Sequence, residues 1–192
     1  MEKDRLAAFS DGVIAVIITI MVLDLKVPPA ATLTALKDTA PTFVSYILSF
    51  VYVAIYWNNH HHFFQLVPRV NGAILWANLH LLFWLSLIPF ATAWLGQNVT
   101  AAIPTALYGV AMLMAALAWN ILQITIIRAQ GTNSAIAKAI GRDIKGKISP
   151  VLYVAGVLLA FVNSIISDAL YILVAMLWLI PDRRVERVLT DQ

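Results

Sequence analysis

The sequence predicts an all-α integral membrane protein with six transmembrane helices in each protomer, and three observations carry this prediction. The 192 residues are 61% hydrophobic and only 12% charged, with a mean hydropathy of +0.82. A soluble domain usually carries about 25% charged residues to cover its surface. No Asp, Glu, Lys or Arg occurs in residues 70–127. The chain also has no cysteine, which excludes disulfides, a thiol nucleophile and a cysteine metal site.

The individual helices follow from the apolar runs, because a span needs about 20 mostly apolar residues. The last apolar block, 148–180, contains Asn163 and Asp168 near its middle. We therefore expect two short helices joined by a tight polar turn, since one long helix would leave Asp168 inside the membrane. The whole chain, 1–192, is then a single transmembrane domain. The expected spans are 6–26, 41–65, 72–96, 101–127, 148–162 and 166–180.

The basic residues predict the orientation, because cytoplasmic loops are enriched in Lys and Arg. With six spans and a cytoplasmic N-terminus, only Lys26 and Lys37 of the 13 basic residues fall outside. A five-span chain would move the C-terminal arginines outside and spoil this distribution. We therefore expect both termini in the cytoplasm of a multi-pass protein of the bacterial inner membrane. The basic residues are topology signals, so no nucleic-acid partner is expected.

Two connections are longer than the others. Residues 27–40 form an outer loop that begins with a Pro-Pro break, and residues 129–147 form the main cytoplasmic loop. Four isoleucines recur in and just after the second loop at four-residue spacing, with basic residues between them. This pattern is typical of an amphipathic helix on anionic inner-leaflet lipid at 129–148, although a charged linker is the alternative. The isoleucines are Ile136, Ile140, Ile144 and Ile148.

Polar side chains of three consecutive spans lie at a similar depth. Ser10 and Asp11 follow the start of the first span, His60 and His61 precede the end of the second, and Asn78 follows the start of the third. At 1.5 Å per residue, each lies roughly 6–10 Å inside the cytoplasmic boundary. Unpaired polar groups are costly there. We expect Ser10 and Asp11 to hydrogen-bond to His60 or His61 and to Asn78.

The same residues allow a sharper chemical reading, because Asp and His are common zinc ligands. Adjacent His60 and His61 project about 100° apart on a helix, whereas two ligands on one helix usually stand four residues apart. We therefore favour a structural network and expect no metal or cofactor. A proton-linked role and a metal site stay open as alternatives.

The first span also carries an apolar stripe. At 100° per residue its members fall within about 80°, with Thr19 on the edge, and Asp11 points about 140° away from Val16. If Asp11 faces the second and third spans, the stripe faces lipid, a neighbouring subunit or a pore. Periodicity alone leaves these three surroundings open. The stripe consists of Phe9, Gly12, Val16, Ile20, Leu23 and Val27.

Several motifs resemble the transmembrane protein 175 family of potassium channels, in its prokaryotic single-repeat branch. The first is Arg5-x-x-x-Phe9-Ser10-Asp11 at the start of the first span. The resemblance continues over nearly the whole chain. Its other motifs are Trp57-x-x-His60-His61-x-x-Phe64, Leu75-Trp76-x-Asn78-Leu79, Pro89-Phe90, Leu107-Tyr108-Gly109, and a final pair of helices ending in Trp178 and Pro181.

The resemblance implies a homotetramer around a central pore that conducts potassium ions without a TVGYG filter. The first helix of each subunit would line this pore. It implies apolar constriction rings at Val16, Ile20 and Leu23, and a role in potassium preference for Thr19. Val16 is smaller than the Ile or Leu usual at the first ring, which implies a wider constriction.

The resemblance places Arg5 and Phe9 in the structural polar network, together with Ser10, Asp11, His60, His61 and Asn78. This network would fix the rotation of the first helix. Three other functions remain possible on the residues alone. They are a proton-coupled secondary transporter, an intramembrane Asp/His metal enzyme and a non-conducting scaffold.

Overall fold

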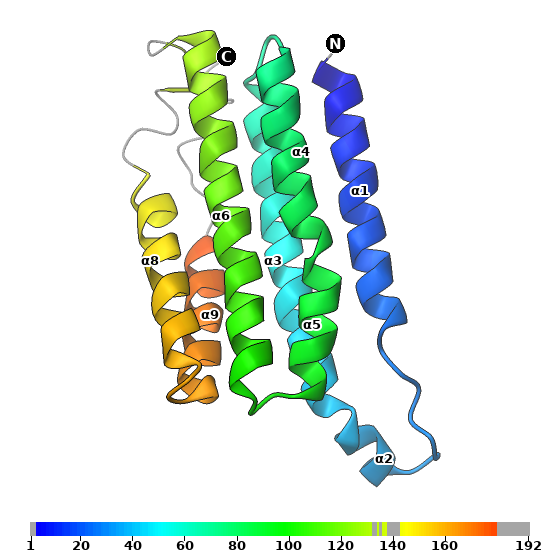
Figure 1. Cartoon of the computed structure of the whole chain (residues 1–192). Coiled ribbons are helices and arrows are strands. Elements are labelled where there is room, and N and C mark those ends of the chain that lie inside the picture. The colour runs from blue at the N-terminus through cyan, green and yellow to red at the C-terminus, as the bar shows by residue number, and fades with distance from the viewer. Residues whose placement is uncertain (1–2, 132–133, 135, 138–142, 180–192) are drawn as a thin grey trace.

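Helices make up nearly all of the chain that the computed structural model describes, which is residues 3–131, 134, 136–137 and 143–179. Short turns connect most of them, and no strand occurs in these residues. Figure 1 shows the long helices standing side by side. The helices are α1 (Lys3–Leu23), α2 (Leu33–Asp38), α3 (Ala40–Gln65), α4 (Gly72–Ser86), α5 (Ile88–Gln97), α6 (Ala102–Gln130), α8 (Ile144–Leu159) and α9 (Ser164–Leu179).

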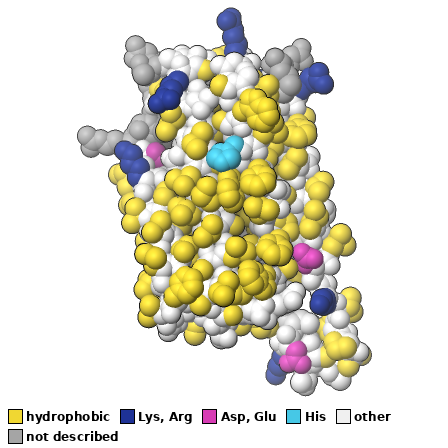
Figure 2. Space-filling model, viewed as in Figure 1, with side chains coloured by type: hydrophobic (Ala, Val, Ile, Leu, Met, Phe, Trp, Pro, Cys, Tyr) yellow, Lys and Arg dark blue, Asp and Glu magenta, His cyan; other side chains and the backbone are white. Residues whose placement is uncertain are grey.

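Four helical stretches within the described residues are long and apolar enough to cross a membrane. They are α1, α3, α6, and α4 together with α5 over residues Gly72–Gln97. Figure 2 shows a broad apolar surface between Lys and Arg side chains at the upper end and charged side chains around α2 at the lower right. This is the charge distribution of a multi-pass membrane protein.

The stretch made of α4 and α5 is interrupted, which the sequence did not predict. Helix α4 ends at Ser86, and α5 begins at Ile88 with Pro89 in its first turn. Proline lacks the N–H that would continue the helical hydrogen bonds. The path of the chain from Gly72 to Gln97 is therefore one crossing made of two helices.

Helices α8 and α9 form a hairpin whose turn contains Asn163, with the Asn163 side chain accepting from the backbone N–H of Ile165 at 3.0 Å. Each helix has 16 residues, about 24 Å at 1.5 Å per residue, against a hydrocarbon core of about 30 Å. In Figure 1 the hairpin extends from the α2 end of the bundle to about half its height. The hairpin is therefore shorter than the helices it packs against.

The two long connections differ from the expectation. The outer loop contains the short helix α2, which begins where the Thr32 side chain accepts from Ala35 N–H. The cytoplasmic connection is not one helix through residues 129–147. Helix α6 ends before Gly131, which has a φ of 92°, and the Asp143 side chain caps α8.

Ile144 and Ile148 accordingly belong to α8 and not to a surface helix shared with Ile136, which is buried. Ile140 lies outside the described residues. The prediction of one continuous amphipathic helix is therefore wrong, because Gly131 with its positive φ and the helix cap at Asp143 interrupt the helical path.

Helix α6 lies at the centre of the subunit and packs against α4, α5, α8 and α9. Small side chains allow this close approach. The ring of Tyr171 on α9 sits against Gly109 of α6 and Gly156 of α8, where a Cβ atom would overlap it. Helix α1 lies at the opposite margin, in contact with α3, α4 and α5. Like α3, it therefore has a face that the rest of the described chain leaves uncovered.

Candidate functional site

Helix α1 has two faces of different character. Its buried face recurs every three or four residues, as expected for one side of a helix, and consists of Leu6, Ser10, Ile14, Ile17 and Met21. On another face Val16 is 54% exposed, Ile20 44% and Leu23 80%. These bulky apolar side chains therefore have little cover within the subunit. Phe9 and Val27 are also exposed.

Thr19 lies beside this apolar stripe and is exposed as well. Its hydroxyl donates to the backbone carbonyl of Val16 at 2.8 Å. That bond uses the only hydrogen of the hydroxyl, so the exposed oxygen can act only as an acceptor toward other groups. An exposed acceptor on an apolar helix face is suited to a cation or to water.

Behind α1, three buried side chains form a hydrogen-bonded chain, which we call the polar layer: Ser10, His60 and Asn78. The Asn78 amide donates to Ser10 Oγ at 2.9 Å, and Asn78 Oδ1 lies 2.8 Å from His60 Nε2. Each side chain is at most 1% exposed. The His60 ring also stacks on Phe64, with the ring centroids 4.4 Å apart. The polar layer joins α1 to α3 and α4, and these contacts agree with the expected ones.

Asp11 makes a different contact from the expected one. Its Oδ1 accepts from the indole Nε1 of Trp57 at 2.9 Å, and not from a histidine. Asp11 and Ser10 are adjacent and project about 100° apart, so Ser10 enters the subunit while Asp11 reaches the outer edge of α3. The sequence contained an indication of this partner, because Trp57 has an indole donor and lies one helical turn before His61.

His61 also lies beside the polar layer and not in it. It is exposed, with Nε2 2.9 Å from the Gln65 side-chain nitrogen, and its ring stacks against Trp57 at 5.8 Å. Arg5 is exposed at the start of α1, and Phe9 is 52% exposed. The expectation that Arg5, Phe9 and His61 join the polar network is therefore not met within this subunit, because all three project away from the Ser10 face.

A cavity of about 140 Å³ opens between the start of α1 and the end of α3, and Asp11, His60 and His61 contribute to its wall together with Asp4 and Lys3. Within the described residues, no three His, Asp or Glu side chains come together as a ligand set for a metal ion. The donors here are dispersed and mostly bonded to other groups. This arrangement suits a polar vestibule better than a metal centre.

A second buried polar group, which the sequence analysis missed, lies deeper in the subunit. We call it the hydroxyl cluster: Ser49, Tyr52, Thr92, Tyr108 and Tyr171. Ser49 Oγ lies 2.6 Å from Thr92 Oγ1 and 3.0 Å from the Tyr108 hydroxyl. Tyr52 donates to the backbone carbonyl of Tyr171, and Tyr171 donates to that of Thr105 at 3.2 Å. The cluster ties α3, α5, α6 and α9 together.

The chain is similar in sequence to known proteins. The family model described as "Endosomal/lysosomal potassium channel TMEM175" matches residues 5–89. A potassium channel of Chryseobacterium sp. (strain P1-3) is 53% identical over 191 residues, covering 100% of both chains. A potassium channel of Streptomyces collinus is 36% identical over 63% of each chain.

A solved structure gives the same result. The crystal structure of a lysosomal potassium-selective channel TMEM175 homolog from Chamaesiphon minutus matches with a TM-score of 0.83 and 28% identity, covering 94% of this chain and 98% of that one. The full-length relative and the solved structure thus indicate the same family. The chain belongs to the TMEM175 family of potassium channels.

Proposed function

We propose that this protein is a potassium-permeable channel of the bacterial cell membrane, with a central pore lined by α1 from four identical subunits. A relative that aligns over the full length is a potassium channel, and the similar solved structure is that of a potassium-selective channel. The permeant ion is K⁺, and no cofactor is required. The family consists of ion channels, which argues against an intramembrane Asp/His enzyme.

The observation that carries this proposal is the exposed stripe of α1. Val16, Ile20 and Leu23 lie on a helix at the margin of the subunit, and α1 is packed from the other side by α3, α4 and α5. Fourfold assembly about an axis beside this stripe would cover it with three copies of itself. The same assembly would make a narrow pore with rings of apolar side chains.

Such rings control conduction by excluding water from a narrow path, so that an ion would have to lose its hydration shell to pass. Widening the path by rotation of α1 admits water and ions. Thr19 lies between two rings, and four exposed Thr19 oxygens would offer an ion the acceptors that it loses with its water. The polar layer would fix the rotation of α1 and so set the width of the rings.

We place the end of the bundle at Lys3 in the cytoplasm, together with the C-terminus. The basic residues of the described chain support this orientation, because Lys3, Arg69 and Arg128 lie at helix ends remote from α2. Helices α8 and α9 would be the fifth and sixth helices inserted in the membrane, each shorter than the other four.

Potassium flux into liposomes containing the purified protein tests the proposal. Val16→Ala and Leu23→Ala should each raise flux severalfold, because smaller side chains widen the rings and hold water more easily. Val22→Ala is the matched control, since Val22 is exposed on α1 but lies about 120° from Val16 around the helix. Unchanged flux in both stripe variants would contradict a constriction at these positions. Flux that saturates and depends on a proton gradient would indicate a secondary transporter instead.

A further inference from the structure

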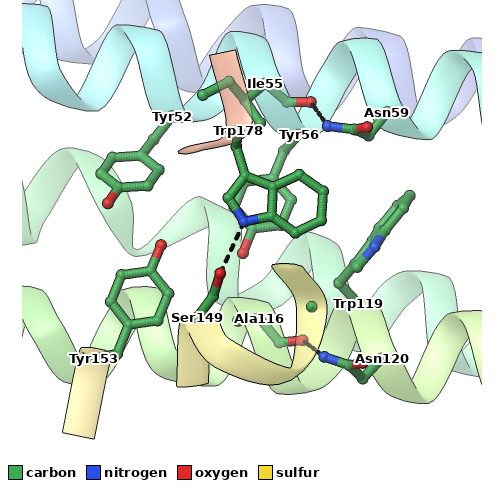
Figure 3. A pocket seen from close by; sticks show the side chains of 11 residues that line it. Tyr52, Ile55, Tyr56, Asn59, Ala116, Trp119, Asn120, Ser149, Tyr153 and Trp178 are labelled. Atoms are coloured by element: carbon green, nitrogen blue, oxygen red, sulfur yellow. Dashed lines mark hydrogen bonds between the residues drawn. The ribbon is translucent and has the colours of Figure 1, made fainter. Parts of the chain in front are cut away.

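A separate cavity of about 30 Å³ lies away from α1, between α3, α6 and the ends of α8 and α9 that are remote from their turn. Figure 3 shows aromatic rings on several sides of it, among them those of Trp178, Trp119 and Tyr56. The Trp178 indole donates to Ser149 Oγ at 2.8 Å, which joins the two helix ends. Space of this size holds about two water-sized groups, so it fits a small head group and not a whole ligand.

The cavity wall offers hydrogen-bond acceptors. The Asn59 amide donates to the Ile55 carbonyl on its own helix, and the Asn120 amide donates to the Ala116 carbonyl, each at 2.8 Å. Within the described part of the chain, no donor contacts Oδ1 of either amide. Asn59 and Asn120 line the cavity from two different helices, and each keeps an amide oxygen without a donor from the described residues. A group that donates hydrogen bonds is the chemical complement of this wall.

A larger groove of about 330 Å³ continues from the cavity along the outer side of α3. The two hollows share Ile55, Asn59 and Trp178 in their walls. The groove is otherwise mainly apolar, with Phe50, Val51, Ala54 and Leu179, although Asn58 also lines it. The groove lies beside the end of α9, where Trp178 and Leu179 form part of its wall.

The charge of the walls limits the ligand further. No Asp, Glu, Lys or Arg is among the described residues that line either hollow. An ammonium or carboxylate head would be buried there without a partner of opposite charge, which is strongly unfavourable. A neutral hydroxyl can donate to either amide oxygen without that cost. The apolar groove then suits a hydrocarbon chain attached to the hydroxyl.

We propose that the cavity and the groove together bind an uncharged amphiphile from the membrane, with its hydroxyl head between Asn59 and Asn120 and its apolar chain in the groove. The site lies in the wall of each subunit and is separate from the α1 stripe. Its ligand class is that of long-chain alcohols and other neutral lipids with a free hydroxyl. Binding there would brace α3 and α6 against the ends of α8 and α9.

Quenching of tryptophan fluorescence tests this site directly, because two of the six Trp residues line the cavity. The full-length protein in liposomes is titrated with dodecanol that carries a brominated tail. We expect a saturable component of quenching that unbrominated dodecanol reverses, while dodecane and dodecylammonium reverse it poorly. Quenching that rises linearly without saturation would overturn the site. Equal competition by dodecylammonium would overturn the neutral head group.

Variants test whether the saturable component of quenching arises at this cavity. Because one hydroxyl donates to one amide oxygen at a time, Asn59→Leu and Asn120→Leu should each raise the midpoint of quenching, and the double variant should raise it about tenfold, the effect of a lost hydrogen bond. Ala116→Leu should abolish the saturable component by filling the cavity. Asn98→Leu is the matched control, because its amide makes the same bond to its own helix outside the cavity. An unchanged midpoint in both amide variants would contradict the proposal. The competition measured on the wild-type protein tests the site even if a variant fails to assemble. Neither this competition nor the quenching midpoint depends on potassium flux, so the test is independent of the proposed channel function.

Discussion

The polar layer and the hydroxyl cluster are both buried polar groups inside one apolar subunit, yet they hold different parts of it. The polar layer joins α1 to α3 and α4 near one end of the bundle. The hydroxyl cluster joins α3, α5, α6 and α9 with one another and does not involve α1. The first therefore positions the proposed pore helix, and the second consolidates the frame around it.

The distribution of hydrogen bonds along α1 sharpens this difference. Among the described residues, the side-chain bonds between α1 and the rest of the subunit come from Lys3, Ser10 and Asp11, all in its first half. From Val13 to Leu23 the helix packs through apolar contacts alone. Apolar contacts are less directional than hydrogen bonds. The half of α1 that carries Val16, Ile20 and Leu23 is thus held in the subunit without directional side-chain bonds.

The largest expected effect tests whether the hydroxyl cluster is part of the frame. Gly109→Ala would place a Cβ atom onto the Tyr171 ring, whose two neighbouring helices leave it no room. We expect a loss of about 3 kcal/mol or more of folding free energy, since overpacking commonly costs about 1–3 kcal/mol and a displaced Tyr171 would lose its bonds as well. Thermal unfolding of the purified protein, followed by circular dichroism, measures it. Gly72→Ala is the control, because nothing lies within 4 Å of a Cβ there.

Removing the centre of the polar layer should rank next. Asn78→Leu leaves Ser10 and His60 buried without their partner, which we expect to cost about 2–3 kcal/mol. Because this bond holds α1, potassium flux should change as well as stability. His80→Leu, on the same helix, removes a bond that stays within α4 and should have a smaller effect on both. If Asn78→Leu lowered stability alone and left flux per folded channel unchanged, the polar layer would belong to the frame.

The two clusters also differ in how far the sequence predicted them. Asp, His and Asn are expensive in lipid, so His60 and Asn78 stood out from their apolar runs and their common depth predicted their contact. Ser, Thr and Tyr are less conspicuous, because Ser and Thr hydroxyls can bond to a carbonyl of their own helix. Nothing in the runs around Ser49 or Thr92 indicated that they meet.

The helices, too, were predicted only in part. Hydropathy predicted where apolar helices occur, since a span needs a long apolar run. It did not predict the break at Leu87 or the cap at Asp143, which depend on single residues at helix ends. The orientation of α1 was predictable from its period, but what covers its open face was not, because assembly depends on a second copy of the chain. The roles of Val16, Thr19, Ile20 and Leu23 in a pore stay predictions.

The contact between Asp11 and Trp57 should have an intermediate effect. Asp11→Leu and Trp57→Phe each break the bond to the indole, and we expect about 1 kcal/mol for either change because the pair is partly exposed. The double variant should cost little more than one single variant, which a double-mutant cycle measures. Flux should fall while the preference for potassium over sodium is retained. A change in that preference alone would show that Asp11 acts on the ion and not on the position of α1.

The smallest expected effect isolates the polar contribution of the hydroxyl cluster. Tyr108→Phe keeps the ring and removes the hydroxyl, and Ser49 retains Thr92 as a partner at 2.6 Å. We therefore expect a loss of only about 0.5–1 kcal/mol and no change in flux. Tyr46→Phe serves as control, since the Tyr46 ring contacts Phe43 and Phe50 but its hydroxyl has no hydrogen-bond partner among the described residues. A change of flux in Tyr108→Phe without a loss of stability would mean that the frame, too, takes part in opening the pore.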